Sequence, residues 1–493
     1  MKILNYREGF ASNSSSTHSV WFGEGADRVM EELVDNFCYG WQNFALKSKE
    51  EITHYIMTQY KNNLFTGEYT DGVDGYKFKY VKSVLASVFG IEPPDELVLE
   101  GAVDHQSRLF IPREQNSNGI DIPSPRFTQE LLESLTRNSN TVIYGGNDNG
   151  DDINVGSRLT RRKDIDSITD LYDGSNIFCR KDGEAWVIFW KDSGRKLRLS
   201  FHENAIYTKA IVPELVDLII SNQCDKHCWY CYRGCNKDGN IAKVGVVESV
   251  LDDLREMGVL EVAIGGGDIL SYPEIGRLCS TAKYMNTNYD IAINTTLYAP
   301  MFSDVNTTNL IRTIIDSFSG VAFSIGCCED VLRVLTRYAD DFDDDTKRKI
   351  SFQTIPELYT DPRELKRVRD LVSRIGFRLV YLGLKETGRA ANIPQWRLGH
   401  IKEMRDKFEE WIKVNGWNPI GIDTQFVKNF PQIKDMDRQN FKWMVTEHEG
   451  KFSCCIDLPN KKMSESSYSG ELFDIHPDTF SFDEEFLEIF SKF

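Results

Sequence analysis

The stretch that organises this sequence reads Cys224-Asp225-Lys226-His227-Cys228-Trp229-Tyr230-Cys231. It places three cysteines at C-x3-C-x2-C spacing, with an aromatic residue directly before the last one. An apolar run at 216–220 precedes it, so we expect a strand that delivers the cysteines into a loop. Three thiols at this spacing favour a metal site over a set of unrelated cysteines.

This loop, called the cysteine loop below, resembles the signature of the radical S-adenosylmethionine (radical SAM) enzymes. In that family three thiolates hold three irons of a [4Fe-4S] cluster, and the open fourth iron binds the amino and carboxylate groups of SAM. The resemblance implies that Cys224, Cys228 and Cys231 are metal ligands and that the cofactors are a [4Fe-4S] cluster and S-adenosyl-L-methionine. An open iron can bind and reductively cleave a cofactor, whereas a closed four-cysteine site passes electrons.

From residue 213 onward, short apolar segments alternate with segments of helical spacing. Six apolar segments are predicted strands, at 215–220, 259–264, 291–293, 321–325, 350–354 and 377–382. The segments between them, and a last one at 401–412, have the spacing of amphipathic helices. Such alternation predicts an α/β fold with a parallel sheet covered by helices. The six units suit the partial (β/α)6 TIM-type barrel that the resemblance implies for residues 213–430.

The remaining sequence predicts three further parts. Residues 1–165 are interpreted as an N-terminal α+β domain with an accessory or substrate-recognition role. Its polar tract 13–19 is either a solvated turn or helix cap, or a ligand loop. Residues 166–212 alternate like a β-meander that connects this domain to the barrel. Residues 431–493 are a C-terminal extension, whose end at 482–493 has the spacing of a helix that docks on the chain's own core.

In parallel α/β architectures, functional groups gather at the C-terminal ends of the strands. The second predicted strand ends in Gly265-Gly266-Gly267-Asp268, where the radical SAM family has a Gly-Gly-Glu-type motif that binds the SAM amino group. Glycines let a backbone approach a ligand closely, and Asp268 stands where glutamate is usual. The other candidate SAM contacts that the resemblance implies are Tyr230, Asn294, Thr296, Ser324, Gly383 and Lys385. Ordinary solvation of these loops is the alternative.

The cysteines outside the triplet are assigned to no cluster. Cys235 extends the spacing of the loop, but a fourth ligand would close the open iron, so we leave it out. Cys327-Cys328 and Cys454-Cys455 are adjacent pairs, which cannot easily reach one metal with good geometry. Auxiliary clusters in the family usually show many spaced cysteines, so we assign none here.

The competing hypothesis is a non-catalytic zinc-binding protein. Cys224, His227, Cys228 and Cys231 make up a Cys3His set. Four ligands within so short a stretch rarely wrap one tetrahedral ion, and zinc leaves the glycine run unexplained. We therefore favour the enzyme.

The bulk composition limits the partners. The 493-residue chain has a formal net charge of −17, which disfavours extended contact with a nucleic-acid backbone. Its 11 cysteines are an odd number and do not suggest a disulfide framework. Neither an apolar signal core nor a run of about 18 apolar residues is present. We expect a cytoplasmic protein without a membrane partner, where reducing conditions suit free thiols and an oxygen-sensitive cluster.

Together with the resemblance, the sequence predicts a radical SAM enzyme, of the oxidoreductase or transferase class. It would cleave SAM reductively to a 5′-deoxyadenosyl radical, which abstracts hydrogen from a substrate. A peptide or protein is the favoured substrate, so that the reaction is a post-translational modification; a small metabolite or nucleotide is the alternative. The resemblance also implies an external one-electron reductant of the flavodoxin or ferredoxin type. No residue is singled out as catalytic.

Overall fold

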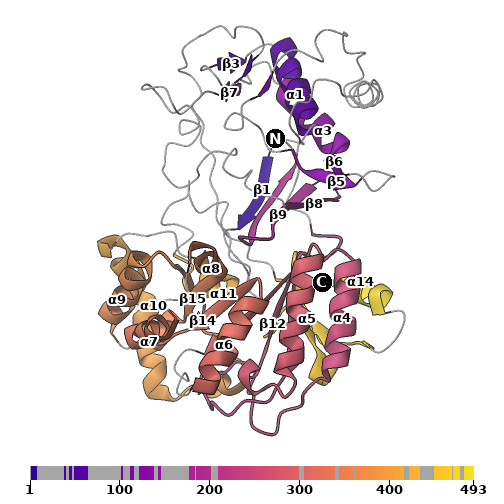
Figure 1. Cartoon of the computed structure of the whole chain (residues 1–493). Helices are drawn as coiled ribbons and strands as arrows, with labels where there is room; N and C mark the ends of the chain where they lie inside the picture. The colour runs from indigo at the N-terminus through magenta and orange to yellow at the C-terminus, as the bar shows by residue number, and fades with distance from the viewer. Residues whose placement is uncertain are drawn as a thin grey trace. The chain divides into compact units, whose positions relative to one another are not determined.

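The computed structural model describes residues 2–7, 38–39, 44–46, 49–64, 102–103, 111–115, 121–137, 143–145, 177–183, 185–200, 209–298, 305–338, 343–359, 361–415, 421–432, 449–468, 470–477 and 482–493. The polar tract 13–19 lies outside these described residues. The chain forms two compact units (Figure 1). The first consists of Met1–Ile3, Trp21–Ile188 and Leu199–Ala205, and the second of Leu4–Val20, Phe189–Arg198 and Ile206–Phe493.

The described residues of the first unit form two helices and several short strands. The helices are α1 (Lys49–Leu64) and α3 (Pro125–Arg137). The strands pair as β2 (Cys38–Tyr39) with β4 (Ala102–Val103), β3 (Phe44–Leu46) with β7 (Ile143–Gly145), and β5 (Arg113–Gln115) with β6 (Asp121–Pro123). Helix α3 packs on β9 (Ala185–Trp190) through Phe127, whose ring is edge-on to that of Trp186 with the ring centroids 5.2 Å apart. The Trp186 indole N–H also donates a hydrogen bond to the Glu130 carboxylate at 2.8 Å.

A four-stranded sheet has the order β1 (Lys2–Arg7), β10 (Arg195–Ser200), β9 (Ala185–Trp190) and β8 (Ile177–Asp182). Strands β9 and β10 form the hairpin that the alternating sequence predicts. Its turn is closed by the Gly194 N–H, which donates to the Trp190 carbonyl at 2.7 Å. Gly194 has a φ of +68°, a conformation that glycine adopts at little cost.

The second unit is built on a parallel sheet, and all six predicted strands are present. They are β11 (Leu215–Ser221), β12 (Glu261–Gly266), β13 (Ala292–Tyr298), β14 (Gly320–Ser324), β15 (Ile350–Thr354) and β16 (Arg378–Tyr381). Each pairs in parallel with the next, and β17 (Gly421–Ile422) follows β16 at the edge. The prediction of an α/β fold with a parallel sheet is confirmed, but strand three is longer than expected because it runs on to Tyr298.

Helices follow the strands of this sheet. They are α4 (Val244–Glu256), α5 (Ile275–Asn288), α6 (Val305–Ser317), α7 (Cys328–Tyr338), α8 (Asp344–Lys349), α9 (Pro362–Arg374), α10 (Gln395–Asn415) and α11 (Thr424–Asn429). Short 3-10 turns lie at η3 (Ile269–Ser271), η6 (Pro356–Leu358) and η7 (Gly388–Asn392). Among the described residues, no helix is long and apolar enough to span a membrane.

The C-terminal residues add to the same sheet. Strand β18 (Ser453–Asp457) lies parallel to β11 on the side away from β12, and β19 (Lys462–Ser464) and β20 (Phe473–Asp474) continue antiparallel beyond η8 (Leu458–Asn460). Helix α14 (Phe482–Lys492) buries Phe482, Phe486, Ile489 and Phe490 in the main core. The predicted docking helix is therefore confirmed, and the tail also supplies a strand beside the one that carries the cysteine loop.

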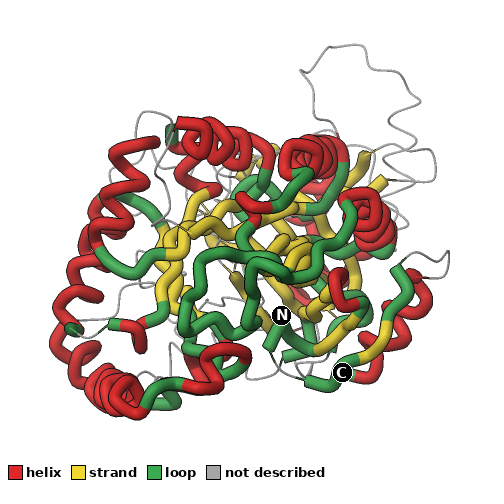
Figure 2. Tube along the Cα trace, turned by 90° about the horizontal axis from the view of Figure 1, so that it is seen from below, coloured by secondary structure: helices red, strands yellow, loops and turns green. Residues whose placement is uncertain are grey.

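The two faces of the parallel sheet differ in polarity. Alternate residues of β11, such as Val216 and Leu218, join the core that the helices cover. Asp217 lies between them in sequence, and successive strand residues point to opposite faces. The outer face is thus apolar, and it packs against helices. Figure 2 shows these helices around the strands. The inner face carries polar side chains, which positions them for a site.

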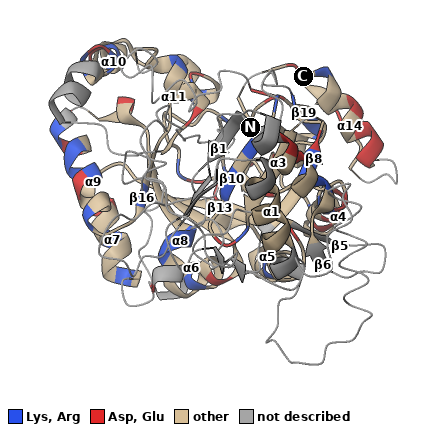
Figure 3. Cartoon of the chain, turned by 90° about the horizontal axis from the view of Figure 1, so that it is seen from above, with Lys and Arg blue, Asp and Glu red and all other residues tan. Residues whose placement is uncertain are grey.

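Charged residues are unevenly distributed over the helices (Figure 3). The first turn of α14 is acidic, whereas α9 is rich in arginine and lysine. Three basic side chains of α9 form ion pairs near the surface, Arg363 with Asp361, Lys366 with Asp370 and Arg367 with Glu364. These pairs are partly exposed and contribute little to stability, but they neutralise much of the local positive charge.

Candidate active site

The C-terminal strand ends surround one cavity of about 220 Å³. All three cysteines of the predicted triplet line it, together with residues from the ends of β11, β12, β13, β14 and β15 and from the segment after β16. Every candidate SAM contact except Asn294 also lines it, namely Tyr230, Gly265, Gly266, Gly267, Asp268, Thr296, Ser324, Gly383 and Lys385. Residues far apart in sequence are thus brought to one cavity by the parallel strand order.

The cysteine loop is closed at its base by backbone contacts. The Cys224 N–H donates to the Asn236 carbonyl at 2.8 Å, and the Asn222 N–H donates to the Asn240 carbonyl at 2.8 Å. Within the loop, His227 has a φ of +51° and is exposed, while the three thiols line the cavity. His227 therefore does not share a site with the thiols.

The described residues do not form a ready-made site for one metal ion. Among the residues that the structure describes, no three His, Cys, Asp or Glu side chains converge as ligands of a single metal ion. Each thiolate of a three-cysteine [4Fe-4S] site binds a different iron, so the thiols need not converge on one point. This geometry gives the zinc hypothesis no support.

Hydrogen bonding changes the acidity of the loop thiols. The Cys235 thiol donates to Cys231, and this bond is the main cause of a lowered pKa of Cys231, to which the Arg389 charge adds. Burial raises the pKa of Cys224. Since the thiolate is the form that binds iron, the lowered pKa of Cys231 favours metal binding by this thiol. Cys235 is 3% exposed and lines the cavity wall, a role that its spacing did not predict.

The glycine run brings β12 close to the base of the cysteine loop. A Cβ atom on Gly266 would lie 2.1 Å from the Ser221 carbonyl oxygen, and one on Gly267 would lie 1.8 Å from the Gln223 carbonyl oxygen. The Gly267 N–H donates to the Ser221 carbonyl at 2.7 Å. These two glycines are therefore required for a close backbone approach within the protein. The Cβ of a substituted Gly265 would meet only the Ile219 side chain, at 3.9 Å.

Asp268 already has partners within the protein. Its carboxylate lies 3.0 Å from Lys226 Nζ in the cysteine loop, accepts from the Ser271 hydroxyl at 3.2 Å, and caps η3 by accepting from the Leu270 N–H. Only 7% of Asp268 is exposed. The side chain thus ties the end of β12 to the cysteine loop, and any contact with SAM would be additional to these bonds.

One wall of the cavity is polar. Tyr230 donates to the Tyr298 hydroxyl at 3.4 Å, and the Gln353 amide donates to the Thr296 hydroxyl at 3.2 Å. Ser324 lines the same cavity from the end of β14. These groups come from the cysteine loop and from three neighbouring strands, so a bound molecule would meet several donors and acceptors on this side.

Asn294 is the exception among the predicted contacts. It is fully buried, and its amide donates to Glu261 at 3.1 Å. Its position was misjudged because β13 does not end at Thr296 but continues to Tyr298. Residues 294, 296 and 298 share one face, since side chains alternate along a strand. Asn294 therefore lies one level deeper in the sheet than the cavity wall.

We expect Asn294→Ala to leave SAM affinity within about twofold of the wild type, because the side chain does not reach the cavity. The matched variant Thr296→Val keeps the side-chain shape and removes a hydroxyl that lines the cavity, so we expect SAM binding to weaken about fivefold. Calorimetric titration of cluster-loaded, unreduced protein with SAM measures both. Weaker binding in Asn294→Ala than in Thr296→Val would reverse this assignment.

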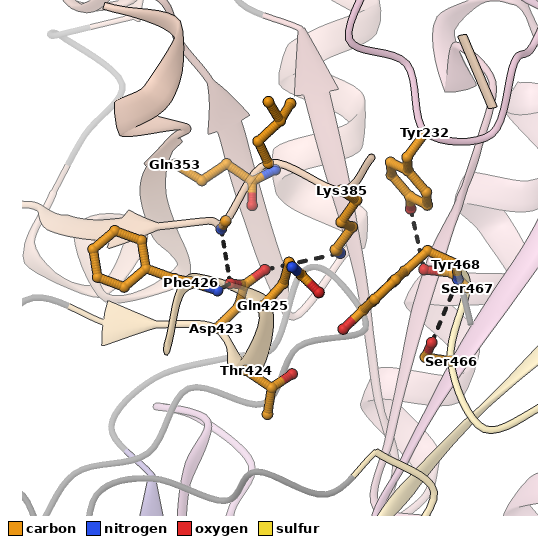
Figure 4. A network of polar contacts seen from close by, with 12 residues as sticks. Tyr232, Gln353, Lys385, Asp423, Thr424, Gln425, Phe426, Ser466, Ser467 and Tyr468 are labelled. Carbon is orange, nitrogen blue, oxygen red and sulfur yellow. Dashed lines mark hydrogen bonds and ion pairs between the residues drawn. The ribbon is translucent and has the colours of Figure 1, made fainter. Parts of the chain in front are cut away.

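The segment after β16 meets a buried polar network (Figure 4). Asp423 accepts from the N–H of Gly383 at 2.8 Å and from that of Phe426 at 2.6 Å, and its second oxygen lies 3.8 Å from Lys385 Nζ. The Gly383 N–H is thus occupied, and a Cβ there would lie 2.4 Å from the Phe426 nitrogen. Gly383 therefore offers a ligand no free N–H donor, and the absence of a side chain allows its close packing against the backbone of Phe426.

Lys385 is held as a buried cation. Its ammonium lies 4.8 Å from the Tyr232 ring centroid and 4.6 Å from that of Tyr468, within the range of cation–π attraction. Burial disfavours the charged form, but Asp423 and Asp217 are among the groups that raise the pKa of Lys385 overall. The side chain lines the cavity, so it supplies a fixed positive charge at the cavity wall.

Asp217 and Tyr298 are among the cavity residues that sequence reasoning missed, although the sequence carried a signal for each. Asp217 is a single carboxylate within an apolar strand, and its 3% exposure shows that it faces the interior. Tyr298 continues the alternation of Asn294 and Thr296 along β13. A charged residue inside a strand and an extended alternation both indicate inward-facing positions.

The fold and the site define an α/β protein whose parallel strands present three thiols, a glycine run and a polar wall to one cavity. Residues 218–415 match the family model described as the radical SAM superfamily. The chain therefore carries a radical SAM domain, and the protein is a radical SAM enzyme. The resemblance of the cysteine loop to the radical SAM family is thus confirmed at the level of the family.

Other comparisons add little to this assignment. No curated protein matches the chain. Among solved structures, SuiB of Streptococcus suis bound to its precursor peptide SuiA has 12% identity and a TM-score of 0.43, over 64% of this chain and 87% of SuiB. BtrN in complex with AdoMet and 2-DOIA has 11% identity and a TM-score of 0.22, over 29% of this chain and 56% of BtrN. Likenesses at these TM-scores carry no functional argument.

The residues of this cavity fit the cofactors of the family, a [4Fe-4S] cluster and SAM. Cys224, Cys228 and Cys231 would hold the cluster, and Cys235 donates to the Cys231 sulfur. When bound, the cluster supplies the electron that cleaves SAM reductively. The protein contributes the close approach at the glycine run, the polar wall and the fixed charge of Lys385, which bind and orient rather than react.

Proposed function

We propose that this radical SAM enzyme abstracts a hydrogen atom from a residue of a peptide or protein. In this proposal a substrate C–H bond breaks, and its hydrogen atom ends on 5′-deoxyadenosine, which is released together with methionine. Cys224, Cys228 and Cys231 hold the cluster. Residues of the glycine run and the polar wall contact SAM.

The size of the cavity is the observation that carries the choice of substrate. Its volume of about 220 Å³ leaves little room beside SAM, since small-molecule sites usually measure ~300–1,000 Å³. The same cavity has to accommodate SAM and the reacting group of the substrate. A substrate that inserts one side chain and leaves the rest outside suits this space better than a metabolite that is enclosed whole.

Gln353 offers a recognition group for such a substrate. The side chain is 2% exposed, and its amide oxygen has no hydrogen-bond partner among the described residues. A buried oxygen of this kind usually has a partner, and an N–H group of a bound molecule would provide it. A peptide carries such donors along its backbone.

Co-expression with the peptides and small proteins encoded beside this enzyme tests the proposal. We expect mass spectrometry to show a mass change in one of them with the wild type and none with Cys228→Ala. Gln353→Leu should lower the yield of modified peptide severalfold and still form 5′-deoxyadenosine without peptide. Consumption of a small metabolite with every peptide unchanged would favour the alternative substrate class. Loss of 5′-deoxyadenosine formation in Gln353→Leu would instead assign Gln353 to SAM.

A further inference from the structure

The side chain of Arg389 binds the backbone of the cysteine loop. Its Nε donates to the Cys228 carbonyl at 2.9 Å, and its Nη1 donates to the Cys235 carbonyl at 2.5 Å. The two carbonyl groups lie on either side of Cys231. One planar guanidinium, with donors in a fixed fork, thus spans the second half of the loop.

The backbone beside Arg389 holds the same loop. The Arg389 N–H donates to the Cys231 carbonyl at 3.0 Å, and the Thr387 hydroxyl donates to the Tyr232 carbonyl at 3.1 Å. Gly388 between them has a φ of +57°, and a Cβ there would lie 2.3 Å from the Tyr232 oxygen. The contact therefore requires glycine at this position. We call Thr387, Gly388 and Arg389 the loop clamp.

The clamp acts on the shape of the loop without supplying a ligand. Its groups donate hydrogen bonds to the carbonyl oxygens of four residues far away in sequence, Cys228, Cys231, Tyr232 and Cys235. Fixing these carbonyls restricts the backbone on which two of the three cluster thiols stand. A preformed loop loses less conformational entropy when it binds its cluster.

Arg389 also places a permanent positive charge beside the cluster site. Arginine is charged at every accessible pH, and Arg389 lines the cavity. Reduction adds a negative charge to an iron–sulfur cluster, and its reduction potential depends on nearby charge and hydrogen bonds. A cation at this position therefore favours the reduced state.

We propose that Arg389 is a positioning residue that holds the cysteine loop in its cluster-binding shape and whose charge makes the cluster easier to reduce. The inference rests on the radical SAM site and holds for any substrate. The positioning part and the charge part of this proposal respond differently to substitution. Lysine keeps the positive charge but loses the planar set of guanidinium donors, whereas glutamine loses the positive charge.

The test compares wild-type enzyme, Arg389→Lys and Arg389→Gln after anaerobic reconstitution. We expect iron loss to a ferrous chelator to be about tenfold faster in both variants, since each loses at least one charge-assisted hydrogen bond. The midpoint potential, followed through the electron paramagnetic resonance signal, should become more negative in Arg389→Gln and stay near the wild-type value in Arg389→Lys. None of these readouts needs a substrate.

Arg397→Gln is the matched control. Its guanidinium lies 4.2 Å from the ring centroid of Trp229 in the same loop, so the variant removes an equal charge beside the loop. We expect iron loss at the wild-type rate in this variant. Equal rates of iron loss in all four proteins, or an unchanged potential in Arg389→Gln, would overturn the proposal.

Thermal unfolding of the apo-proteins separates positioning from simple stabilisation. If Arg389→Gln takes up no iron but unfolds at the wild-type temperature, the clamp is needed for loading and the proposal stands. If Arg389→Gln unfolds at a lower temperature, its iron loss has two explanations, lost positioning or lost stability. The Arg389→Lys variant then decides between them. Wild-type iron retention in a normally stable Arg389→Lys would contradict a positioning role.

Discussion

Cys228→Ala is expected to abolish 5′-deoxyadenosine formation with dithionite and SAM. Cys228 is the central cysteine of the loop, and its thiol lines the cavity with those of Cys224 and Cys231. Alanine offers no ligand, so one iron of the cluster would lose its attachment to the protein. Wild-type protein reconstituted under anaerobic conditions should be brown, with about four irons per chain, whereas the variant should retain little iron. Chromatography of the reaction mixture should show no 5′-deoxyadenosine above the level without enzyme.

Cys327→Ser is the control for this prediction. Cys327 lies in the loop after β14, is partly exposed and does not line the cavity. We expect iron content and SAM cleavage like those of the wild type. Cys235→Ser should also retain iron, since the family holds its cluster with three cysteines. SAM cleavage by Cys228→Ala, or a colourless wild type with one zinc ion, would refute the cluster assignment.

Substitutions within the glycine run should have sharply different effects. In Gly267→Ala, the new Cβ would lie 1.8 Å from the Gln223 carbonyl oxygen, which is backbone and cannot turn aside. In Gly265→Ala it would only contact a side-chain carbon of Ile219 at 3.9 Å, an ordinary van der Waals distance. We expect Gly267→Ala to cost on the order of 3 kcal/mol of folding free energy and to displace the base of the cysteine loop.

Denaturant unfolding and iron analysis measure both consequences. Gly267→Ala should unfold at a lower denaturant concentration and take up several times less iron than the wild type. Gly265→Ala should match the wild type in both measurements, although its SAM affinity is free to change because Gly265 lines the cavity. Equal iron uptake and stability in the two variants would mean that the close approach of Gly267 to Gln223 does not hold the loop.

Much of the parallel sheet and its covering helices was predictable because the signals for these elements are local. Helical and strand spacing depend on residues a few positions apart, so the six strands and the helices between them were located from the pattern alone. The cysteine triplet is likewise contained in one short loop. The glycine run follows directly on β12, and strand order alone implies that it meets the cysteine loop.

The ends of strands were less predictable than their existence. Asn294 looked like a strand-end residue because the apolar run stops before it. Its strand continues because Tyr298 pairs with Ser324 in β14, a contact that involves a distant segment. Polar residues that face the interior of a sheet do not interrupt a strand, so composition alone placed the end too early.

The sequence by itself determined the class of chemistry, through three cysteines whose spacing suits an open cluster, and the α/β scaffold, through its periodicity. Only the tertiary structure decided what surrounds those cysteines. It placed Arg389 on the carbonyls of the cysteine loop, Gln353 in the polar wall with an oxygen that no described residue bonds, and β18 beside β11. Such contacts join residues widely separated in sequence, and they arise when the whole sheet and its helices pack, which no local pattern encodes.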